Sequence, residues 1–317
     1  MVEDSVCTVI RRVDGIAELG GVEGPLCLAL GVFDGVHVGH RAVIGRAVEA
    51  AAECGGVAGV VTFEPHPIRL LAPEKAPRRL LASVEHKQAI VGELGVELLV
   101  VIPFTREFAG LAAGDFVGEL VSAAGDLRLV AVGEDWRFGR GRGGDIGFLK
   151  GAGEQHGFEV AAVAPVMMNG ERVSSTRIRQ AIRDGNLDAA SGMLGRSYAV
   201  AGVVIEGRKL GRTIGFPTVN LAVADEQMPP DGVWKVRVRV DDESFDGVAN
   251  LGRRPTVGGA ERTLEAHLFD FDADLYGRWI EVEFGTFLRE ERKFGSVEAL
   301  TEQIAADVEA ARALDGR

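Results

Sequence analysis

An apolar run from Leu26 to Leu30 leads into a glycine-bearing turn over residues 31–40, and the turn leads into a helical pattern. An apolar run of this length is typical of a buried strand. Turns between a strand and a helix bind phosphates in α/β proteins, because free backbone N–H groups and the helix dipole converge there. His37 and His40 stand three residues apart at the helix start, so we expect both side chains on one helix face, directed at the same anion. The sequence therefore predicts a nucleotide-phosphate site near the N-terminal end.

Further apolar runs alternate with helical patterns as far as Gly185. Near-continuous apolar strands separated by helices indicate a parallel sheet that is covered on both faces, in a Rossmann-like α/β domain. Ligands of such sheets bind beyond the carboxyl ends of the strands, where the turn at 31–40 falls. The later strands are expected at 57–63, 96–104, 127–132 and 160–166, with helices at 84–94 and 113–124 among them.

The pattern changes after Gly185. Two short helical segments, 176–183 and 187–194, flank this point, and strands with strict apolar–polar alternation follow at 234–240 and 263–269. Several short strands separated by glycine and proline turns indicate an antiparallel β-barrel. Ser296 is the expected N-cap of a closing amphipathic helix. We therefore predict two domains, 1–185 and 186–317.

Composition excludes several classes of protein. The 317 residues are 46% hydrophobic and 26% charged, as in ordinary globular proteins, and the net charge of −12 argues against a nucleic-acid binder. The N-terminus lacks the pattern of a signal peptide, and no apolar run approaches the ~20 residues of a membrane span. Cys7, Cys27 and Cys54 have no metal-ligand spacing, which favours free thiols and a cytoplasmic location.

A second segment combines hydroxyl groups with a cation at a predicted helix start. Ser174, Ser175 and Thr176 can cap that helix, and Arg177 adds a permanent positive charge, so the segment can also bind an anion. Two such termini in one domain suit a triphosphate held at both ends. For the histidine pair, a zinc site is the weaker alternative because third and fourth ligands are missing. Gly39 between them removes a side chain that would block the approach of a phosphate.

With the histidine pair at 37–40 and the segment at 174–179, the first domain resembles the nucleotidylyltransferase superfamily. The segments at 31–40, 62–67 and 132–139 resemble in particular the prokaryotic bifunctional riboflavin kinase/FMN adenylyltransferases, although Trp136 stands where that family usually has Phe. The resemblance implies catalytic roles for His37, His40 and Arg177, without a covalent enzyme intermediate. It further implies that ATP is bound by Gly31, Phe33, Asp34, Gly39, Ser174, Ser175 and Thr176, and the flavin by Glu64, His66, Asp135, Phe138 and Arg172.

The second half has its own motif at 207–220, which contains no Walker A loop. Thr218 and Asn220 are two residues apart, so in an extended segment both side-chain oxygens face the same way and suit Mg²⁺ and its bound phosphates. The run from Gly215 to Asn220 resembles the riboflavin kinase signature. That resemblance implies Glu265 as the catalytic base, Trp234 as a flavin contact in place of the usual Tyr, and ATP binding by Gly207, Lys209, Gly215 and Pro217.

The two resemblances together imply an enzyme that phosphorylates riboflavin to FMN and then adenylylates FMN to FAD. Its expected partners are riboflavin, FMN and ATP with Mg²⁺, without nucleic acid or membrane, and a homo-oligomer is an open possibility. The alternatives are a chain that retains one of the two activities, a related enzyme with another acceptor such as nicotinamide mononucleotide or phosphopantetheine, and a non-catalytic flavin-binding regulator.

Overall fold

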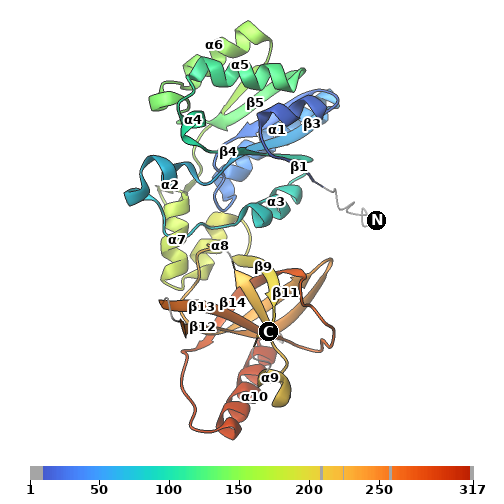
Figure 1. Ribbon diagram of the computed structural model, residues 1–317, viewed down its shortest axis with the longest axis vertical. Coiled ribbons are helices and arrows are strands. Elements are labelled where there is room, and N and C mark those ends of the chain that lie inside the picture. The colour runs from blue at the N-terminus through green and yellow to red at the C-terminus, as the bar shows by residue number, and fades with distance from the viewer. Residues whose placement is uncertain (1–9, 208–209, 224, 257–258, 315–317) are drawn as a thin grey trace. The chain divides into compact units, whose positions relative to one another are not determined.

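The computed structural model describes residues 10–207, 210–223, 225–256 and 259–314, which form two compact units (Figure 1). The first unit comprises residues 10–78 and 84–174, and the second comprises residues 79–83 and 175–314. Cys7 and Lys209 lie outside the described residues.

The first unit is built on a six-stranded, all-parallel sheet in the order β1-β4-β3-β2-β5-β6. Chain order runs outward from β2 through β3 to β4, and then returns to the other side of β2 for β5 and β6. The direction therefore reverses between β2 and β5, which is where sheets of this kind bind ligands. The strands are β1 (Arg11–Val13), β2 (Leu26–Leu30), β3 (Val57–Glu64), β4 (Leu98–Pro103), β5 (Leu127–Gly133) and β6 (Glu159–Val163).

Helices cover both faces of this sheet. Leu26, Leu28 and Leu30 pack with Phe116 and Leu120 of α5 in one core cluster, whereas α1 packs against β2, β3 and β5. Every residue of β2 is consequently buried, which explains its uninterrupted apolar sequence. The helices are α1 (Val38–Cys54), α2 (Pro67–Leu71), α3 (Val84–Gly92), α4 (Arg106–Ala109), α5 (Ala113–Ala124) and α6 (Ile146–His156), with 3-10 turns η1 (Ile16–Gly21), η2 (Pro73–Lys75) and η3 (Arg140–Arg142) and a hairpin of β7 (Met167–Met168) and β8 (Glu171–Arg172).

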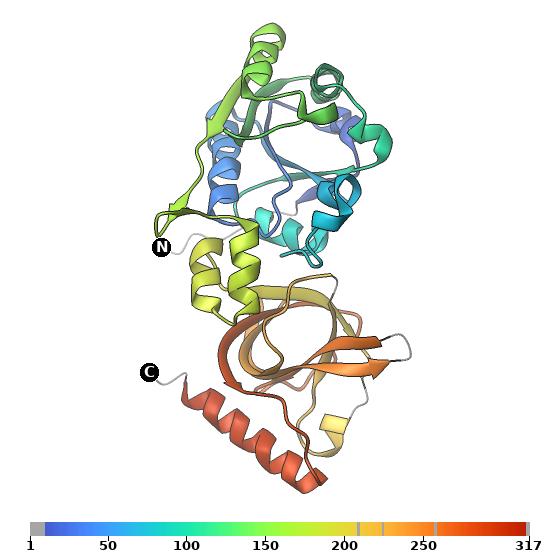
Figure 2. The same ribbon diagram turned by 90° about the vertical axis from the view of Figure 1, so that its left-hand side faces the viewer.

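The second unit contains a closed antiparallel barrel in the order β10-β13-β12-β11-β14-β9, visible as a ring in Figure 2. Helix α10 packs on β12 and β14, and Ser296 caps its first turn by accepting from the Ala299 N–H, as predicted. The elements are α7 (Ser175–Arg183), α8 (Leu187–Leu194), β9 (Ala199–Ile205), α9 (Leu210–Thr213), β10 (Val219–Val223), β11 (Gly232–Val240), β12 (Glu243–Thr256), β13 (Gly259–Leu268), β14 (Trp279–Arg289) and α10 (Val297–Ala313).

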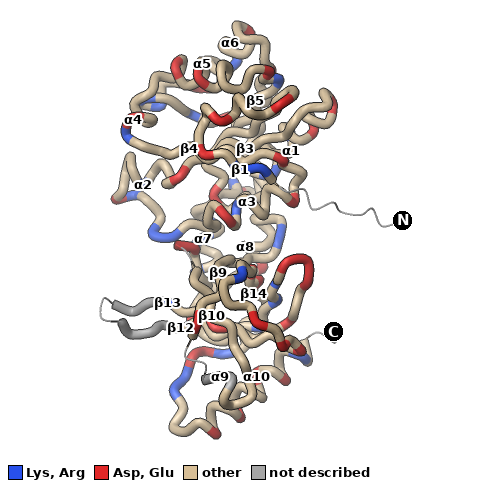
Figure 3. Tube along the Cα trace, turned by 45° about the vertical axis from the view of Figure 1, so that its right-hand side comes forward, with Lys and Arg blue, Asp and Glu red and all other residues tan. Residues whose placement is uncertain are grey.

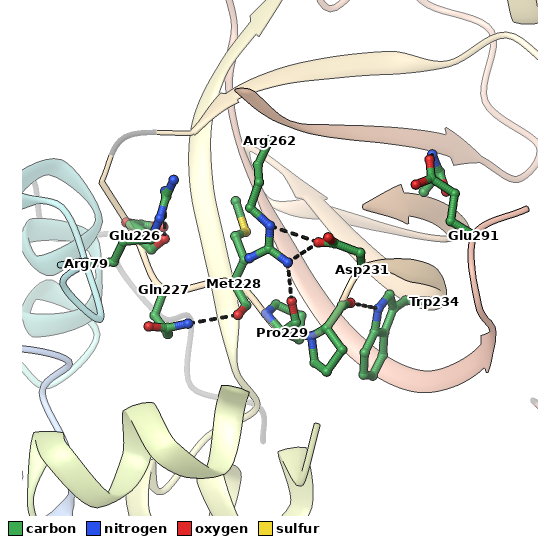
Figure 4. A network of polar contacts seen from close by, with 11 residues as sticks. Arg79, Glu226, Gln227, Met228, Pro229, Asp231, Trp234, Arg262 and Glu291 are labelled. Atoms are coloured by element: carbon green, nitrogen blue, oxygen red, sulfur yellow. Dashed lines mark hydrogen bonds and ion pairs between the residues drawn. The ribbon is translucent and has the colours of Figure 1, made fainter. Parts of the chain in front are cut away.

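A short segment from much earlier in the chain completes this second unit (Figure 4). Leu80 forms a parallel bridge with Glu226, whose buried carboxylate accepts from the backbone N–H groups of Ser83 at 2.7 Å and Ala201 at 3.1 Å. Figure 4 also shows Arg262, which donates to the Pro229 carbonyl at 2.7 Å. A buried carboxylate with two backbone donors is fully compensated, so it ties residues 79–83 to the barrel.

The predicted fold class is confirmed for both halves. The domain boundary near Gly185 stays a prediction, because the division into compact units does not show to which functional site α7 and α8 belong.

Figure 3 shows Lys and Arg interspersed with Asp and Glu along the trace of each unit. Among the described helices, none is long and apolar enough to cross a membrane. Cys27 and Cys54 are free thiols, and the cytoplasmic location remains a prediction.

Candidate active sites

The predicted histidine pair lies together at the start of α1. His37 is the N-cap, and its Nδ1 accepts from the His40 N–H at 3.3 Å, so the proton of the neutral ring is on Nε2. The two rings stack with centroids 3.5 Å apart. A Cβ on Gly39 would lie 3.1 Å from the His37 ring, and one on Gly31 would lie 2.9 Å from the Phe33 ring. Both glycines are therefore needed for the packing of this turn.

His40 is held in its neutral form. Burial, followed by the electrostatic effects of His37, Lys87 and Arg172, lowers the pKa of His40 well below its usual value. Its Nδ1 is buried and has no hydrogen-bond partner within the described part of the chain. A buried ring nitrogen without a partner favours a site in which a ligand completes the hydrogen bonding. Asp34, predicted as an ATP contact, is buried in the same turn.

An aromatic cavity of about 430 Å³ lies in the first unit, beside this turn. Its walls come from the loop after β2, the end of β3, the segment around α4 and the loop after β5. The rings of Trp136 and Phe138 stack at 4.4 Å, and Phe104 and Phe108 contact edge to face at 5.7 Å. Such a cavity suits a flat aromatic ligand. The lining includes Val32, Phe63, Pro67, Phe104, Phe108, Phe116, Asp135, Trp136 and Phe138.

The predicted flavin contacts of the first unit are divided between this cavity and its surroundings. Phe138 and Asp135 line the cavity, and Asp135 forms an ion pair with Arg172, with Nη1 and Oδ2 2.5 Å apart. The hydrogen bond from Arg172 holds the pKa of the Asp135 carboxyl below its usual value. His66 caps α2 by accepting from the Ile68 N–H at 3.2 Å, and Glu64 ends β3. Their roles toward a flavin stay predictions.

The second predicted anion-binding segment runs through the point in the sequence at which the first unit ends. Ser174 is the last residue of the first unit, and α7 begins the second unit at Ser175, with Thr176 and Arg177 in its first turn. That these residues meet the same triphosphate as His37 remains a prediction.

Three polar side chains form a row across adjacent strands of the barrel. Glu265 on β13 pairs with Asn220 on β10 in one direction and with Asn250 on β12 in the other. Residues paired across strands point to the same face of the sheet. Glu265 and Asn250 line a cavity of about 300 Å³ that extends to α10, and Asn250 Nδ2 donates to Glu291 Oε1 at 3.4 Å. The predicted base thus faces a cavity that can hold a ligand.

Thr218 and Asn220 both lie against the glycine turn that precedes them. A Cβ on Gly207 would lie 2.6 Å from Asn220 Cγ, and one on Gly211 would lie 3.3 Å from Thr218 Oγ1. The hydroxyl of Thr218, which lines the Glu265 cavity, and the amide oxygen of Asn220, which is paired with Glu265, fit a hard cation such as Mg²⁺. Mg²⁺ binds through few protein oxygens and its substrate phosphates. The residues present therefore fit the predicted magnesium site.

Thr218 separates two cavities. It lines the Glu265 cavity and also a second one of about 260 Å³, to which Pro217, Leu268 and Tyr276 contribute. The Pro217 carbonyl is hydrogen-bonded to His267 Nδ1 at 2.8 Å, which fixes the loop between the cavities. Gly215 adopts a left-handed backbone with φ of 86° after α9, as only glycine does without strain.

Trp234, the predicted flavin contact on β11, is a buried residue. Its side chain is 2% exposed, donates to the Pro230 carbonyl at 3.1 Å and packs on Phe287 and Phe284. It is not among the described residues that line either barrel cavity, so its flavin contact stays a prediction.

Sequence reasoning did not single out Phe104, Phe108 and Phe116 of the first cavity, and it missed Asn250 and Lys87. The aromatic residues at 104, 108 and 116 were visible as a local cluster. Asn250 and Lys87 gave no comparable signal, since only strand pairing and burial make them notable.

Comparisons with known proteins find a family match in each half of the chain. Residues 22–177 match the family model of FAD synthetase, and residues 194–314 match that of riboflavin kinase. A bifunctional riboflavin kinase/FMN adenylyltransferase of Pseudomonas fluorescens is 43% identical over 91% of this chain and 93% of its own length. The Escherichia coli K12 enzyme of the same name is 40% identical over 97% and 98%.

A solved structure described as a macrolide-efflux protein from Streptococcus pneumoniae matches 96% of this chain and 99% of its own, with 32% identity and a TM-score of 0.78. The two family models cover most of the chain in the order that the sequence motifs predicted. The chain therefore belongs to the bifunctional riboflavin kinase/FMN adenylyltransferase family.

Proposed function

We propose that the two reactions of this family take place in separate units of the chain, FAD formation at the carboxyl ends of β2 and β5 and FMN formation around Glu265. One observation carries the proposal: each unit has its own cavity, and each cavity is lined by residues of the corresponding motif. The substrates are then riboflavin, FMN and ATP.

In the first unit, the aromatic cavity takes the isoalloxazine ring of FMN. A phosphate oxygen of FMN attacks the α-phosphorus of ATP, the new P–O bond forms, and the bond to pyrophosphate breaks. The nucleophile is already an anion, so catalysis needs positioning and charge stabilisation rather than a base. The Nε2–H of His37 supplies a donor at the start of α1, where the helix dipole also favours the phosphates. Arg177, in the first turn of α7, is the cation that the sequence predicts for the triphosphate.

In the barrel, the Glu265 cavity takes riboflavin and the smaller cavity beyond Thr218 takes the nucleotide. Glu265 accepts the proton of the riboflavin 5′-hydroxyl as that oxygen attacks the γ-phosphorus and ADP leaves. Thr218 and Asn220 would hold Mg²⁺, which neutralises phosphate charge when bound. Because Thr218 lines both cavities, the transferred phosphoryl group passes beside it.

Product analysis tests the proposal directly. Purified protein is incubated with riboflavin and Mg-ATP, and FMN and FAD are separated by chromatography. His37→Ala should abolish FAD formation and retain FMN formation, whereas Glu265→Gln should abolish FMN formation and retain FAD formation from supplied FMN. Loss of both activities from either substitution, with FAD formation measured from supplied FMN, contradicts the two-site assignment. Flavin binding without any turnover would instead support a regulator, and a single product in the parent protein would support one retained activity.

A homo-oligomer remains a prediction from the sequence. Light scattering tests for a homo-oligomer by measuring the molar mass of the protein in solution.

A further inference from the structure

A buried lysine lies beneath the phosphate-binding turn of the first unit. Lys87 on α3 is only 5% exposed, and its Nζ donates to the Val32 carbonyl at 2.8 Å and to Thr62 Oγ1 at 3.0 Å. Thr62 is itself fully buried on β3 and donates to the same Val32 carbonyl at 2.9 Å. Buried lysines are uncommon and are retained where their charge or geometry is used.

The turn that these bonds hold is strained. Phe33 has a φ of 49° and Val36 a φ of 42°, both in the left-handed region that side-chain-bearing residues avoid, and a β-branched residue most of all. Strained backbone persists only where the surroundings over-determine it. Val32 directly precedes the first strained residue, and its carbonyl accepts from two donors on two other elements. The anchor is therefore at the point where the turn leaves β2.

The charge of Lys87 also acts on the site. Burial lowers the pKa of Lys87, while the charges of Asp34 and Glu64 oppose that shift. The positive charge of Lys87 is in turn one cause of the lowered pKa of His40. The ammonium group therefore acts on the turn through its hydrogen bond to Val32 and on His40 through its positive charge.

We propose that Lys87 is a positioning residue for adenylyl transfer, which holds the Val32 carbonyl and thereby the strained turn that carries His37 and His40. This inference rests on the proposed adenylyl-transfer site. Lys87 acts through the turn and need not touch either substrate. Its loss should therefore lower kcat for FAD formation more than it changes KM for FMN or ATP.

The test compares variants of the full chain, assayed for both activities. Lys87→Met removes both hydrogen bonds and the charge at similar length, and we expect kcat for FAD formation to fall about 100-fold with FMN formation unchanged. Lys87→Arg keeps the charge and the donors and should recover at least about a tenth of the parent kcat. Lys150→Met, at an exposed position of α6, is the matched control and should leave both activities unchanged.

A double-mutant cycle adds a readout that simple destabilisation does not produce. Thr62→Val removes one of the two donors to Val32, and we expect a loss of about fivefold in kcat. The double variant should lose little more than Lys87→Met alone, because both act through one carbonyl. Additive losses in kcat from the two substitutions would contradict a shared action through the Val32 carbonyl.

The proposal is overturned if Lys87→Met retains kcat for FAD formation within about twofold, or if it lowers FMN formation equally. If Lys87→Met does not fold, Thr62→Val decides, and an unchanged kcat in that variant overturns the proposal. His37→Ala is assayed in parallel: if it retains FAD formation, the assigned site is wrong, whereas if only Lys87→Met retains it, the site stands and the role of Lys87 is wrong.

Discussion

Replacing Gly207 with alanine tests the barrel site through a single methyl group. Gly207 lies directly against the side chain of Asn220, the predicted magnesium ligand two residues after Thr218. A Cβ at this position would be 2.6 Å from Asn220 Cγ, whereas ordinary contact begins at 3.4 Å. Moving Cγ from 2.6 Å to 3.4 Å takes 0.8 Å, and the amide must move by at least about this much because its Nδ2 would lie closer still to the added Cβ.

A displacement close to 1 Å in a positioned catalytic group costs about 100-fold in rate. That loss corresponds to about 2.7 kcal/mol of transition-state stabilisation, since each tenfold is 1.36 kcal/mol. We therefore expect Gly207→Ala to lower kcat for FMN formation about 100-fold. FAD formation from supplied FMN should be unchanged, because the α/β unit is not touched.

The assay follows FMN and FAD by chromatography at saturating riboflavin over a series of Mg²⁺ concentrations. Because the displaced group is the predicted magnesium ligand, the Mg²⁺ concentration that gives half-maximal rate should rise. Gly295→Ala is the matched control, since a Cβ there meets nothing within 4 Å. FMN formation by Gly207→Ala within about twofold of the parent would refute the reasoning, because Asn220 would then not need its observed position.

Three further predictions concern other parts of the structure. Burial and neighbouring positive charges lower the pKa of His40, so below pH 6.5 the unfolded state binds more protons than the folded state. The free energy of unfolding should therefore fall as the pH decreases through 6.5. His40→Gln should weaken this pH dependence, measured by urea unfolding at several pH values. Asp307→Ala removes the buried carboxylate that accepts from Arg289 at 2.7 Å, and it should lower the unfolding free energy of the barrel unit by about 3 kcal/mol. Asp270→Ala breaks an exposed ion pair with Arg312 and should change that free energy by less than about 1 kcal/mol. Trp136→Ala removes a wall of the aromatic cavity and should raise KM for FMN in FAD formation about tenfold without affecting FMN formation, and an unchanged KM would place the flavin elsewhere.

Local sequence patterns predicted the main elements because their causes are local. The apolar run at Leu26–Leu30 and the glycine turn after it predicted β2 and the start of α1. Alternation at 234–240 predicted β11, in which buried and more exposed residues alternate as expected. The spacing of His37 and His40 correctly placed the two rings on one face, because three residues make nearly one helical turn.

Contacts between distant segments decided the rest. The aromatic cavity joins residues from four separate segments, and the Asn220–Glu265–Asn250 row exists only because three strands pair in one register. The motif predicted Trp234 as a flavin contact and said nothing of its burial. The alternation of its strand and its packing on Phe287 bury it, and the flavin contact stays a prediction.

The sequence by itself determined the two fold classes and their order, and it predicted two phosphate-binding turns, since each depends on short-range periodicity and on residue chemistry at fixed spacing. Only the tertiary structure decided what supports those turns. Lys87 reaches Val32 across 55 positions, and residues 79–83 join the barrel through Glu226. Such partners are selected by burial and hydrogen-bond geometry in three dimensions, which no local pattern records.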